Sequence, residues 1–480
     1  MSVDPEVRRL TLSCLLLGFA GETPPGWLVR ALGDGLAGLV LFGSNVGDGT
    51  RIRDLTDRLR AEAGRDLVLA LDEEGGDVTR LDTVRGSAFP GAAALGWLDD
   101  QGTTEEVYAA IGARVADAGC TLVLAPVADV NLDPRNPVIG VRSFGTDPVL
   151  VGRQVAAAVR GLQRAGVAAC VKHFPGHGAT PTDSHRQVAR LDRSLAELES
   201  TELPPFAAAV SAGTAAVMTG HLLVPSLDPN ALATVSTAIT SGLLRGRMGF
   251  DATVVTDALE MKPVADTIGV VDAVVGALAA GADTIETGAH ESPELVEEIP
   301  AAVQAALDDG RLAIGRLWDA SRRTARLASS RPVRGQAAAG SLDGLAARCV
   351  ETLGRLPELA RPLVIEARPN GSIASGPLPW SLAEPLSRRV RSTEAVTVDG
   401  PESLAGLDAR SRGRSLVVVV RDPGRHPWQQ ELVRLAERHP SGVVVDVGWP
   451  ARLPRGLPAV RTRGIAPGLL EAAAVRLAAF

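Results

Sequence analysis

The sequence has few aromatic residues and few cysteines. Aromatic side chains make up 3% of the 480 residues, and there is a single tyrosine. The four cysteines lie far apart and form no CxxC pair: Cys14, Cys120, Cys170 and Cys349. This spacing excludes a disulfide framework and a zinc site built from neighbouring cysteines, so we expect free buried thiols.

Lysine is almost absent, and no long apolar run occurs. Lys172 and Lys262 are the only lysines and the net charge is -7, which argues against a nucleic-acid partner. No apolar stretch approaches the roughly 20 residues that span a bilayer. Residues 8–20 imitate a signal peptide but lack a clean small-x-small cleavage site. We therefore expect a cytoplasmic protein with no membrane partner.

The remaining composition is that of an ordinary folded protein on a long chain. Apolar residues make up 45% of the sequence and charged residues 22%, close to the globular average. Because a single core rarely grows beyond about 250–300 residues, the length predicts two domains. We place a first domain at residues 1–330, a linker at 331–336 and a second domain at 337–480.

The first domain contains eight short apolar runs, many rich in valine, which is the pattern of buried parallel strands. They are Cys14–Phe19, Gly38–Phe42, Leu67–Leu71, Leu122–Pro126, Ala168–His173, Ala216–Gly220, Ala252–Asp257 and Asp283–Glu286. Helical periodicity lies between most of them, at Thr104–Ala118, Pro148–Ala165, Leu195–Ala212 and Ser236–Arg247, and again at 291–328. Eight strand-helix units predict an α/β fold, a (β/α)8 TIM-type barrel with its active site at the carboxyl ends of the strands.

The second domain repeats the alternation on a smaller scale. Strand patterns occur at Pro362–Ile365, Leu416–Val420 and Gly442–Val447, and a helical pattern at Trp428–Arg438 lies between the last two. They predict a smaller three-layer α/β sandwich at the C-terminal end of the chain.

The most informative polar cluster follows the fifth predicted strand. Residues 172–178 read KHFPGHG and residues 183–185 read DSH, so three of the seven histidines share fourteen residues. Metal binding is one interpretation, but the spacing is neither HxxxH on a helix nor HxH on a strand and favours it little. Proton transfer is the other interpretation, because Asp183 could orient the imidazole of His185 and hold its tautomer.

Two further clusters also follow predicted strands. Residues 254–261 read VVTDALEM, so Asp257 ends a strand where it could attack or bind a substrate, or cap the next helix. Residues 71–80 read LDEEGGDVTR, four acidic residues beside two glycines and Arg80. A polyhydroxy substrate would satisfy those carboxylates. A solvated acidic turn is the alternative, and for Glu73 and Asp77 we prefer it.

In this order, the three clusters resemble those of glycoside hydrolase family 3, and most closely its β-N-acetylglucosaminidases. In that subgroup KHFPGHG followed by DSH forms a mobile catalytic loop. The resemblance extends through LFGSN at 41–45, IGVRSFG at 139–145, MTGH at 218–221 and TDALEM at 256–261, and so covers the predicted barrel. The second domain has no matching motif.

The resemblance implies a retaining exo-β-N-acetylglucosaminidase that removes terminal β-linked N-acetylglucosamine without a metal or other cofactor. It makes Asp257 the nucleophile and His185, oriented by Asp183, the general acid/base, while His177 braces the loop. It implies substrate-binding roles for Asp72, Arg80, Arg142, Lys172, His173, His221 and Met261. Two departures from the family are Ala179, where many relatives have Asp and which could alter loop bracing, and Asp77, where Arg is common.

A histidine acid/base is chemically workable because an imidazole titrates near pH 6.5. It repels anionic material less than a second carboxylate would, so we expect peptidoglycan fragments, with a small carbohydrate or muropeptide as substrate. The Gly- and Pro-rich loop predicts gating over the substrate. We expect a monomer or weak dimer. Three alternatives remain: a β-N-acetylglucosaminide phosphorylase, a non-catalytic sugar-binding protein and a metal-dependent hydrolase.

Overall fold

The computed structural model describes residues 3–47, 52–289, 292–330, 342–369, 374–376 and 378–479. The chain forms two compact units. The first comprises Met1–Glu73, Gln101–Leu132 and Gly145–Ala339, and the second comprises Glu74–Asp100, Asp133–Phe144 and Gly340–Phe480. The linker expected at 331–336 and the domain start expected at 337 lie outside the described residues, so the expected boundaries stay a prediction.

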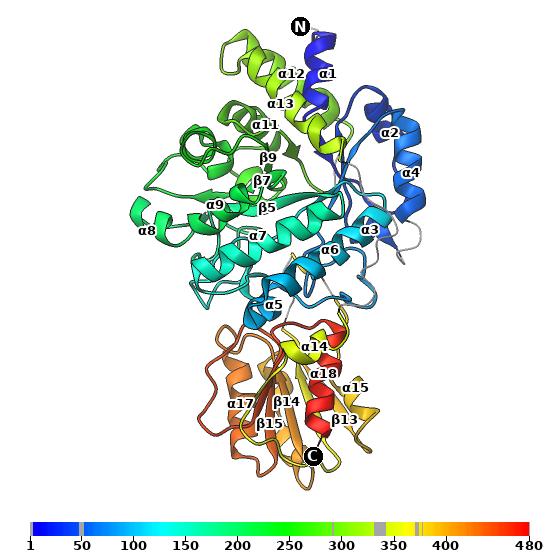
Figure 1. Cartoon of the computed structure of the whole chain (residues 1–480), viewed down its shortest axis with the longest axis vertical. Coiled ribbons are helices and arrows are strands. Elements are labelled where there is room, and N and C mark those ends of the chain that lie inside the picture. The colour runs from blue at the N-terminus through cyan, green and yellow to red at the C-terminus, as the bar shows by residue number, and fades with distance from the viewer. Residues whose placement is uncertain are drawn as a thin grey trace. The chain divides into compact units, whose positions relative to one another are not determined.

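The first unit is a barrel of eight parallel strands surrounded by helices (Figure 1). The strands are β1 Leu15–Leu17, β2 Gly38–Val40, β3 Val68–Leu71, β4 Leu122–Val123, β5 Ala168–Phe174, β7 Ala216–Thr219, β9 Thr253–Thr256 and β10 Ile285–Glu286. They pair in the order β10-β1-β2-β3-β4-β5-β7-β9, and a bridge from Val255 to Thr284 joins β9 back to β10. Each strand coincides with one of the eight predicted runs, which confirms the (β/α)8 prediction.

The helices of the first unit largely follow the predicted pattern. They include α1 Pro5–Leu12, α2 Gly26–Gly33, α4 Ile52–Ala63, α6 Gln101–Asp117, α7 Pro148–Arg164, α8 Leu195–Ser200, α9 Leu203–Ser211, the π-helix η3 Ala238–Arg247, α11 Val270–Ala280, α12 Leu295–Asp308 and α13 Ile314–Ala328. The single helix predicted at Leu195–Ala212 is two helices. Pro204 and Pro205 lie in the first turn of α9 and have no backbone N–H group, so they cannot continue the hydrogen bonding of α8. No helix in the described part of the chain is both long and apolar enough to cross a membrane.

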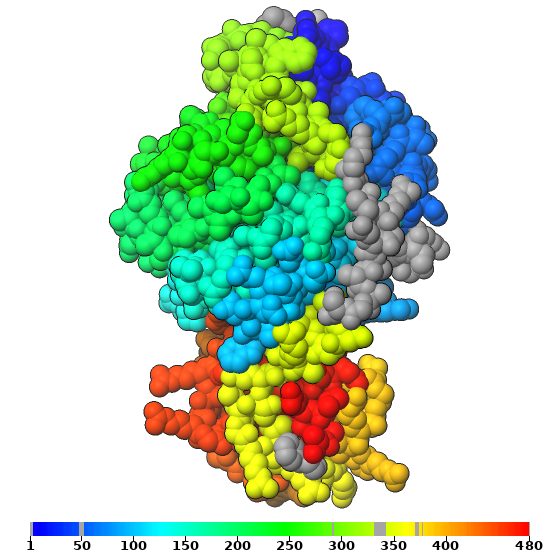
Figure 2. All heavy atoms as spheres, in the orientation of Figure 1, coloured from blue at the N-terminus to red at the C-terminus, as the bar shows by residue number. Residues whose placement is uncertain are grey.

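The beginning and the end of the barrel segment lie side by side. Helix α1 packs on α12 and α13, and the three helices form one edge of the unit (Figures 1 and 2). Arg8 of α1 forms an ion pair with Glu297 of α12 at 2.8 Å. The hydroxyl oxygens of Ser13 and Ser321 lie 2.6 Å apart. These contacts close the ring of helices where the chain enters and leaves it.

The barrel interior determines where the polar side chains point. Residues two apart on a strand face the same side. The interior core contains Ala70, Cys170 and Val255. The residues two positions further along these strands are Asp72, Lys172 and Asp257. These three polar residues therefore stand directly above the apolar core, at the carboxyl end of the barrel.

The second unit is built on a six-stranded mixed sheet with the strand order β11-β16-β15-β14-β12-β13. Its strands are β11 Glu351–Leu353, β12 Leu363–Ala367, β13 Glu394–Val398, β14 Leu416–Val420, β15 Gly442–Asp446 and β16 Ala459–Arg461. Its helices include α5 Ala92–Leu98, α14 Leu345–Cys349, α15 Ala383–Ser387, α16 Leu407–Ser411, α17 Pro427–Arg438 and α18 Pro467–Ala478. Helix α17 packs on β14 and β15, whereas α18 contacts β16, α14 and α15, so that helices flank the sheet as predicted (Figure 1).

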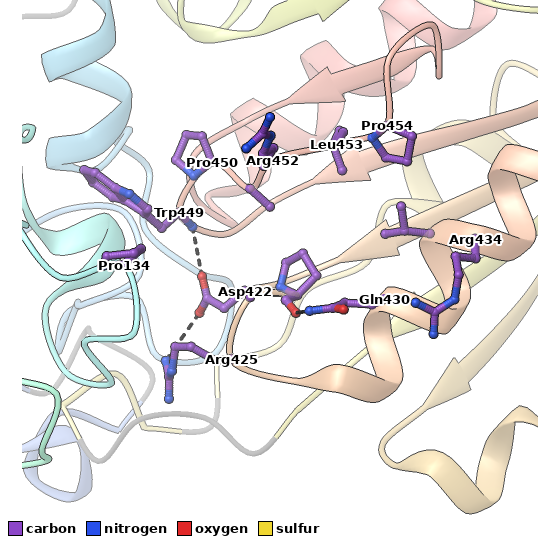
Figure 3. Close-up of a pocket in the computed structure, with 14 residues that line it drawn as sticks. Pro134, Asp422, Arg425, Gln430, Arg434, Trp449, Pro450, Arg452, Leu453 and Pro454 are labelled. Carbon is purple, nitrogen blue, oxygen red and sulfur yellow. Dashed lines mark hydrogen bonds and ion pairs between the residues drawn. The ribbon is translucent and has the colours of Figure 1, made fainter.

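A pocket of about 390 Å³ opens at the carboxyl ends of β14 and β15 (Figure 3). Asp422 accepts a hydrogen bond from the backbone N–H of Trp449 at 2.9 Å and pairs with Arg425 at 3.5 Å. Arg434 and Arg452 also line this pocket. None of the predicted site residues lines it.

Candidate active site

An ion pair joins two barrel strands at the mouth of the first unit. The Lys172 ammonium, at the end of β5, lies 2.5 Å from a carboxylate oxygen of Asp72, which follows β3. The Lys172 side chain is 3% exposed and that of Asp72 is 18% exposed. Removing both charged groups from water costs free energy unless the other N–H groups of the ammonium and the other lone pairs of the carboxylate also form hydrogen bonds. A sugar hydroxyl can both accept from the ammonium and donate to the carboxylate.

His173 is held by a buried carboxylate that the sequence analysis missed. Its Nδ1 lies 2.7 Å from Oδ2 of Asp129, which is fully buried. The other oxygen of Asp129 accepts the backbone N–H groups of His173 at 3.3 Å and His177 at 2.7 Å. Because an ionised carboxylate can only accept, Nδ1 of His173 carries a proton and Nε2 is left for a ligand. The only sequence signal was an acidic residue soon after the fourth predicted strand.

Asp183 and His185 form a hydrogen-bonded pair on the loop after β5. Oδ1 of Asp183 lies 2.9 Å from Nδ1 of His185 and also accepts the His185 backbone N–H at 2.9 Å. Burial alone would raise the pKa of Asp183, but the hydrogen bonds from His185 outweigh it and hold that pKa below its ordinary value. The ionised carboxylate fixes the proton on Nδ1. The His185 ring is 20% exposed, and its Nε2 is available for proton transfer.

His177 braces this loop from within. Its Nδ1 lies 2.6 Å from the hydroxyl oxygen of Thr180, and its Nε2 lies 2.7 Å from that of Ser184. The ring is 1% exposed, and these contacts agree with the bracing role expected for it. Gly178 packs so closely that a Cβ there would lie 1.8 Å from the carbonyl oxygen of Val130. The loop thus holds its shape through two hydroxyl groups and a glycine, without a carboxylate at position 179.

Asp257 follows β9 at the carboxyl end of the barrel and is partly exposed. One oxygen accepts the backbone N–H of Ala258 at 2.9 Å. Burial would raise the pKa of Asp257, but the imidazoles of His221, His173 and His185, together with that N–H group, hold the pKa below its ordinary value. The charges of these three rings therefore act on Asp257, which is ionised at neutral pH.

His221 supports the segment that carries Asp257. It is fully buried, with Nδ1 2.8 Å from the Thr234 hydroxyl and Nε2 2.9 Å from the carbonyl oxygen of Ala258. Burial lowers the pKa of His221, so the ring is neutral at neutral pH and becomes charged only in acid. Both ring nitrogens are engaged with protein groups. Met261 lies in the same segment and is 8% exposed.

Arg80 and Arg142, which we expected to bind the sugar, belong to the second unit. Arg142 is buried and forms two hydrogen bonds with Glu74, at 2.9 and 2.7 Å, and a third with the carbonyl oxygen of Val138 at 3.1 Å. Arg80 donates to the carbonyl oxygen of Ala374 at 3.0 Å. Their contacts in this unit stabilise the segment that follows β3.

The prediction that Glu73 and Asp77 lie in a solvated acidic turn is wrong. The exposed fraction is 1% for Glu73 and 4% for Asp77. Asp77 pairs with Arg421 at 2.8 Å and accepts the backbone N–H of Ile465 at 3.0 Å. Both partners come from the C-terminal part of the sequence, and no local pattern pointed to them. The departure at position 77 therefore serves contacts within the second unit.

A further carboxyl group, Glu286, was also missed. It ends β10 and is 4% exposed. Burial and the negative charges of Asp257 and Asp72 raise the pKa of Glu286 well above its ordinary value. The sequence placed Glu286 at the end of the eighth predicted strand but gave no sign that it would face the barrel interior. Throughout the described residues, no group of three or more His, Cys, Asp or Glu side chains is arranged to hold a metal ion.

Comparison with known proteins is consistent with this geometry. The glycosyl hydrolase family 3 N terminal domain matches residues 31–327. A protein named Beta-hexosaminidase from Xylella fastidiosa (strain M23) is 38% identical over 296 residues, which cover 60% of this chain and 86% of that protein. Beta-hexosaminidase A from Pseudoalteromonas piscicida is 35% identical over 268 residues, and the match covers 52% of this chain but only 45% of that protein. The solved structure of a glycoside hydrolase family 3 beta-N-acetylglucosaminidase from Paenibacillus sp. str. FPU-7 aligns with a TM-score of 0.87 and 29% identity, and covers 98% of this chain and 96% of that one.

Proposed function

The chain belongs to glycosyl hydrolase family 3, a family of glycoside hydrolases, and from this premise we propose that it is a retaining exo-β-N-acetylglucosaminidase. The relatives named above as beta-hexosaminidase and beta-N-acetylglucosaminidase support this activity. The observation that carries the proposal is the pairing of His185 with ionised Asp183 on the loop after β5, together with the electrostatic influence of the His185 ring on the ionised carboxylate of Asp257. Together they supply an acid/base and a nucleophile.

The proposed reaction has two displacements at the anomeric carbon. In the first, a carboxylate oxygen of Asp257 bonds to this carbon while the glycosidic bond breaks. Nε2 of His185 gives its proton to the departing oxygen, and Asp183 stabilises the ring while it is charged. In the second, His185 takes a proton from water, the water oxygen bonds to the anomeric carbon, and the bond to Asp257 breaks. Two inversions retain the β configuration in the released sugar.

We assign the sugar-binding roles by the chemistry of the polar groups at the carboxyl end of the barrel. Asp72 and Lys172 would bind adjacent hydroxyl groups, and Nε2 of His173 would bind a third. Arg80 and Arg142 remain proposed sugar ligands on the family resemblance alone. His221, with both nitrogens engaged, acts in this proposal by fixing the backbone beside Asp257, and Met261 forms part of the wall.

Peptidoglycan fragments are the substrates we propose, because the acid/base is an imidazole. A second carboxylate would repel the lactyl and peptide carboxylates of a muropeptide, whereas His185 attracts them when it is protonated. We expect a higher kcat/KM for a muropeptide than for the same disaccharide with its carboxylates amidated. The difference should shrink as salt screens the charges. Equal values at low salt would contradict this choice of substrate.

The nucleophile is tested by trapping. A 5-fluoro-N-acetylglucosaminyl fluoride should accumulate as a glycosyl-enzyme, and peptide mapping should find the label on Asp257. Asp257→Asn should take up no label, whereas His439→Ala, in the second unit, should be labelled like the wild type. Label on another carboxylate would refute the assignment. A proton NMR spectrum recorded early in turnover should show the β-anomer of the free sugar.

Two alternatives are separated by simple measurements. A phosphorylase is favoured by one observation, since an imidazole repels incoming phosphate less than a carboxylate does. Phosphate would then accelerate turnover and yield N-acetylglucosamine 1-phosphate, whereas a hydrolase is unaffected by it. A non-catalytic sugar-binding protein would bind N-acetylglucosamine but leave a chromogenic N-acetylglucosaminide intact.

A further inference from the structure

Glu286 is a buried acidic residue that the proposed reaction does not use. It is 4% exposed, and its Oε2 has no hydrogen-bond partner among the described residues. Its backbone is fixed on both sides: its N–H donates to the Thr256 hydroxyl at 3.0 Å, and its carbonyl oxygen accepts the N–H of Leu259 at 3.1 Å. A buried polar atom without a partner is costly, so a native structure rarely keeps one without a role.

Strand register places the Glu286 side chain inside the barrel beside Asp257. Glu286 pairs with Leu16 of β1, which belongs to the interior core, and paired residues of parallel strands face the same side. On its other side, β10 is bridged to β9 between Thr284 and Val255, and Val255 is also an interior residue. Glu286 lies two positions beyond Thr284, and Asp257 lies two positions beyond Val255. Both therefore face the barrel interior at the same level, on neighbouring strands.

The strongest charges that act on Glu286 are mostly negative. Asp257, Asp72 and Glu260 contribute negative charge, and the cation that acts most strongly on Glu286 among the described residues is Lys172, which lies 2.5 Å from Asp72. Burial, reinforced by Asp257 and Asp72, raises the pKa of Glu286 well above its ordinary value. The buried site therefore favours the neutral form of this carboxyl group, and in that form it can donate a hydrogen bond.

We propose that Glu286 is a substrate-binding residue that donates a hydrogen bond from its neutral carboxyl group to an oxygen atom of the bound N-acetylhexosamine. The inference rests on the proposed function, because it places the sugar above Asp257. The bound sugar supplies the partner that the buried carboxyl group lacks. A neutral donor also binds the sugar without adding a second negative charge beside the nucleophile, unlike an ionised carboxylate.

Two substitutions separate this role from simple packing. Glu286→Gln keeps the shape and a neutral donor, so its kcat/KM at neutral pH should stay within about threefold of wild type. Glu286→Leu keeps the volume but removes the donor, so KM for a chromogenic N-acetylglucosaminide should rise about tenfold with a smaller change in kcat. Ionisation at high pH removes the donor from the wild type but not from Glu286→Gln. The alkaline limb of the kcat/KM profile should therefore extend to higher pH in Glu286→Gln.

Asp446→Asn provides a matched control, because Asp446 is another fully buried carboxyl group with a raised pKa, located in the second unit. It should leave KM and the pH profile unchanged. A wild-type KM in Glu286→Leu would overturn the inference. Equal losses in Glu286→Gln and Glu286→Leu, together with equally lowered unfolding temperatures, would also overturn it and indicate a structural role.

Calorimetric titration with N-acetylglucosamine keeps this test independent of catalysis. Glu286→Leu should bind the sugar about tenfold more weakly than the wild type. A wild type that binds the sugar but hydrolyses no glycoside would refute the proposed function, while weaker binding by Glu286→Leu would still support the inference. An active wild type whose sugar affinity is unchanged in Glu286→Leu would refute the inference and leave the function standing.

Discussion

Replacing Asp129 by asparagine should reverse the hydrogen-bonding roles of His173 with little change in shape. Asp129 is fully buried and accepts three donors: Nδ1–H of His173 at 2.7 Å and the backbone N–H groups of His173 and His177. Asparagine keeps one oxygen, which can still accept both backbone groups. Its amide nitrogen then faces Nδ1, so the imidazole must give up its Nδ1 proton and carry the proton on Nε2.

The tautomer change predicts a large effect on activity and a small effect on stability. Exchanging a charged acceptor for a neutral one should lower the free energy of unfolding by about 1–2 kcal/mol. A ligand group that donates to Nε2 would then meet a donor, a mismatch of about 2 kcal/mol that lowers kcat/KM about 30-fold. Asp129→Ala leaves all three donors without an acceptor and should be much less stable.

The assay is kcat/KM for a chromogenic N-acetylglucosaminide, measured with the thermal unfolding midpoint. If Asp129 acts through His173, the loss caused by Asp129→Asn should largely disappear in a His173→Gln background. Asp309→Asn is the control, because Asp309 is 48% exposed in a surface ion pair with Arg311 and should change neither quantity. An Asp129→Asn variant with wild-type kcat/KM, or losses that simply add in the double variant, would refute the reasoning.

Three further substitutions test other parts of the structure. Gly178→Ala places a Cβ 1.8 Å from the carbonyl oxygen of Val130, so the loop must shift and kcat should fall at least about tenfold; unchanged steady-state kinetics would contradict this. Asp77→Ala removes the buried carboxylate that pairs with Arg421, whose side chain is 15% exposed, and should lower the stability of the second unit by about 3 kcal/mol. Calorimetry should show an earlier transition, and an unchanged thermogram would refute the prediction. Burial raises the pKa of Asp446 to about 7, so the folded protein keeps a proton that the unfolded chain releases above about pH 4, and stability should fall as the pH rises between those values. Asp446→Asn should flatten the change in unfolding midpoint between pH 5 and 8, and an equally steep change would exclude Asp446 as its source.

The strands of the barrel could be predicted because their environment is uniform. A strand such as β9 is buried on both faces and therefore reads as an apolar run, and the polar residue that ends it, Asp257, marks the carboxyl end. The edge strand β13 is mostly exposed and only its last residue, Val398, is buried, so its residues show no clear strand pattern. The short strands β11 and β16 were missed as well.

The site could be predicted where chemistry and local spacing coincide. Asp183 and His185 are two residues apart, so their hydrogen bond follows from a local turn. Asp129 and Glu286 depend instead on which way a side chain points after a strand, and this is set by register with strands far away in the sequence. Asp77 shows the same difficulty, because its partner Arg421 comes from a distant part of the chain.

The second unit is assembled from three separate pieces of the chain: Glu74–Asp100, Asp133–Phe144 and Gly340–Phe480. A protein shortened to its first 330 residues would keep every barrel strand but would lose the two groups that bind the carboxylate of Asp77, Arg421 and the backbone of Ile465. That carboxylate would have to find water or another cation. Cutting the chain after residue 330 therefore does not yield two self-sufficient parts, and a graft of either part onto another protein must carry matching partners with it.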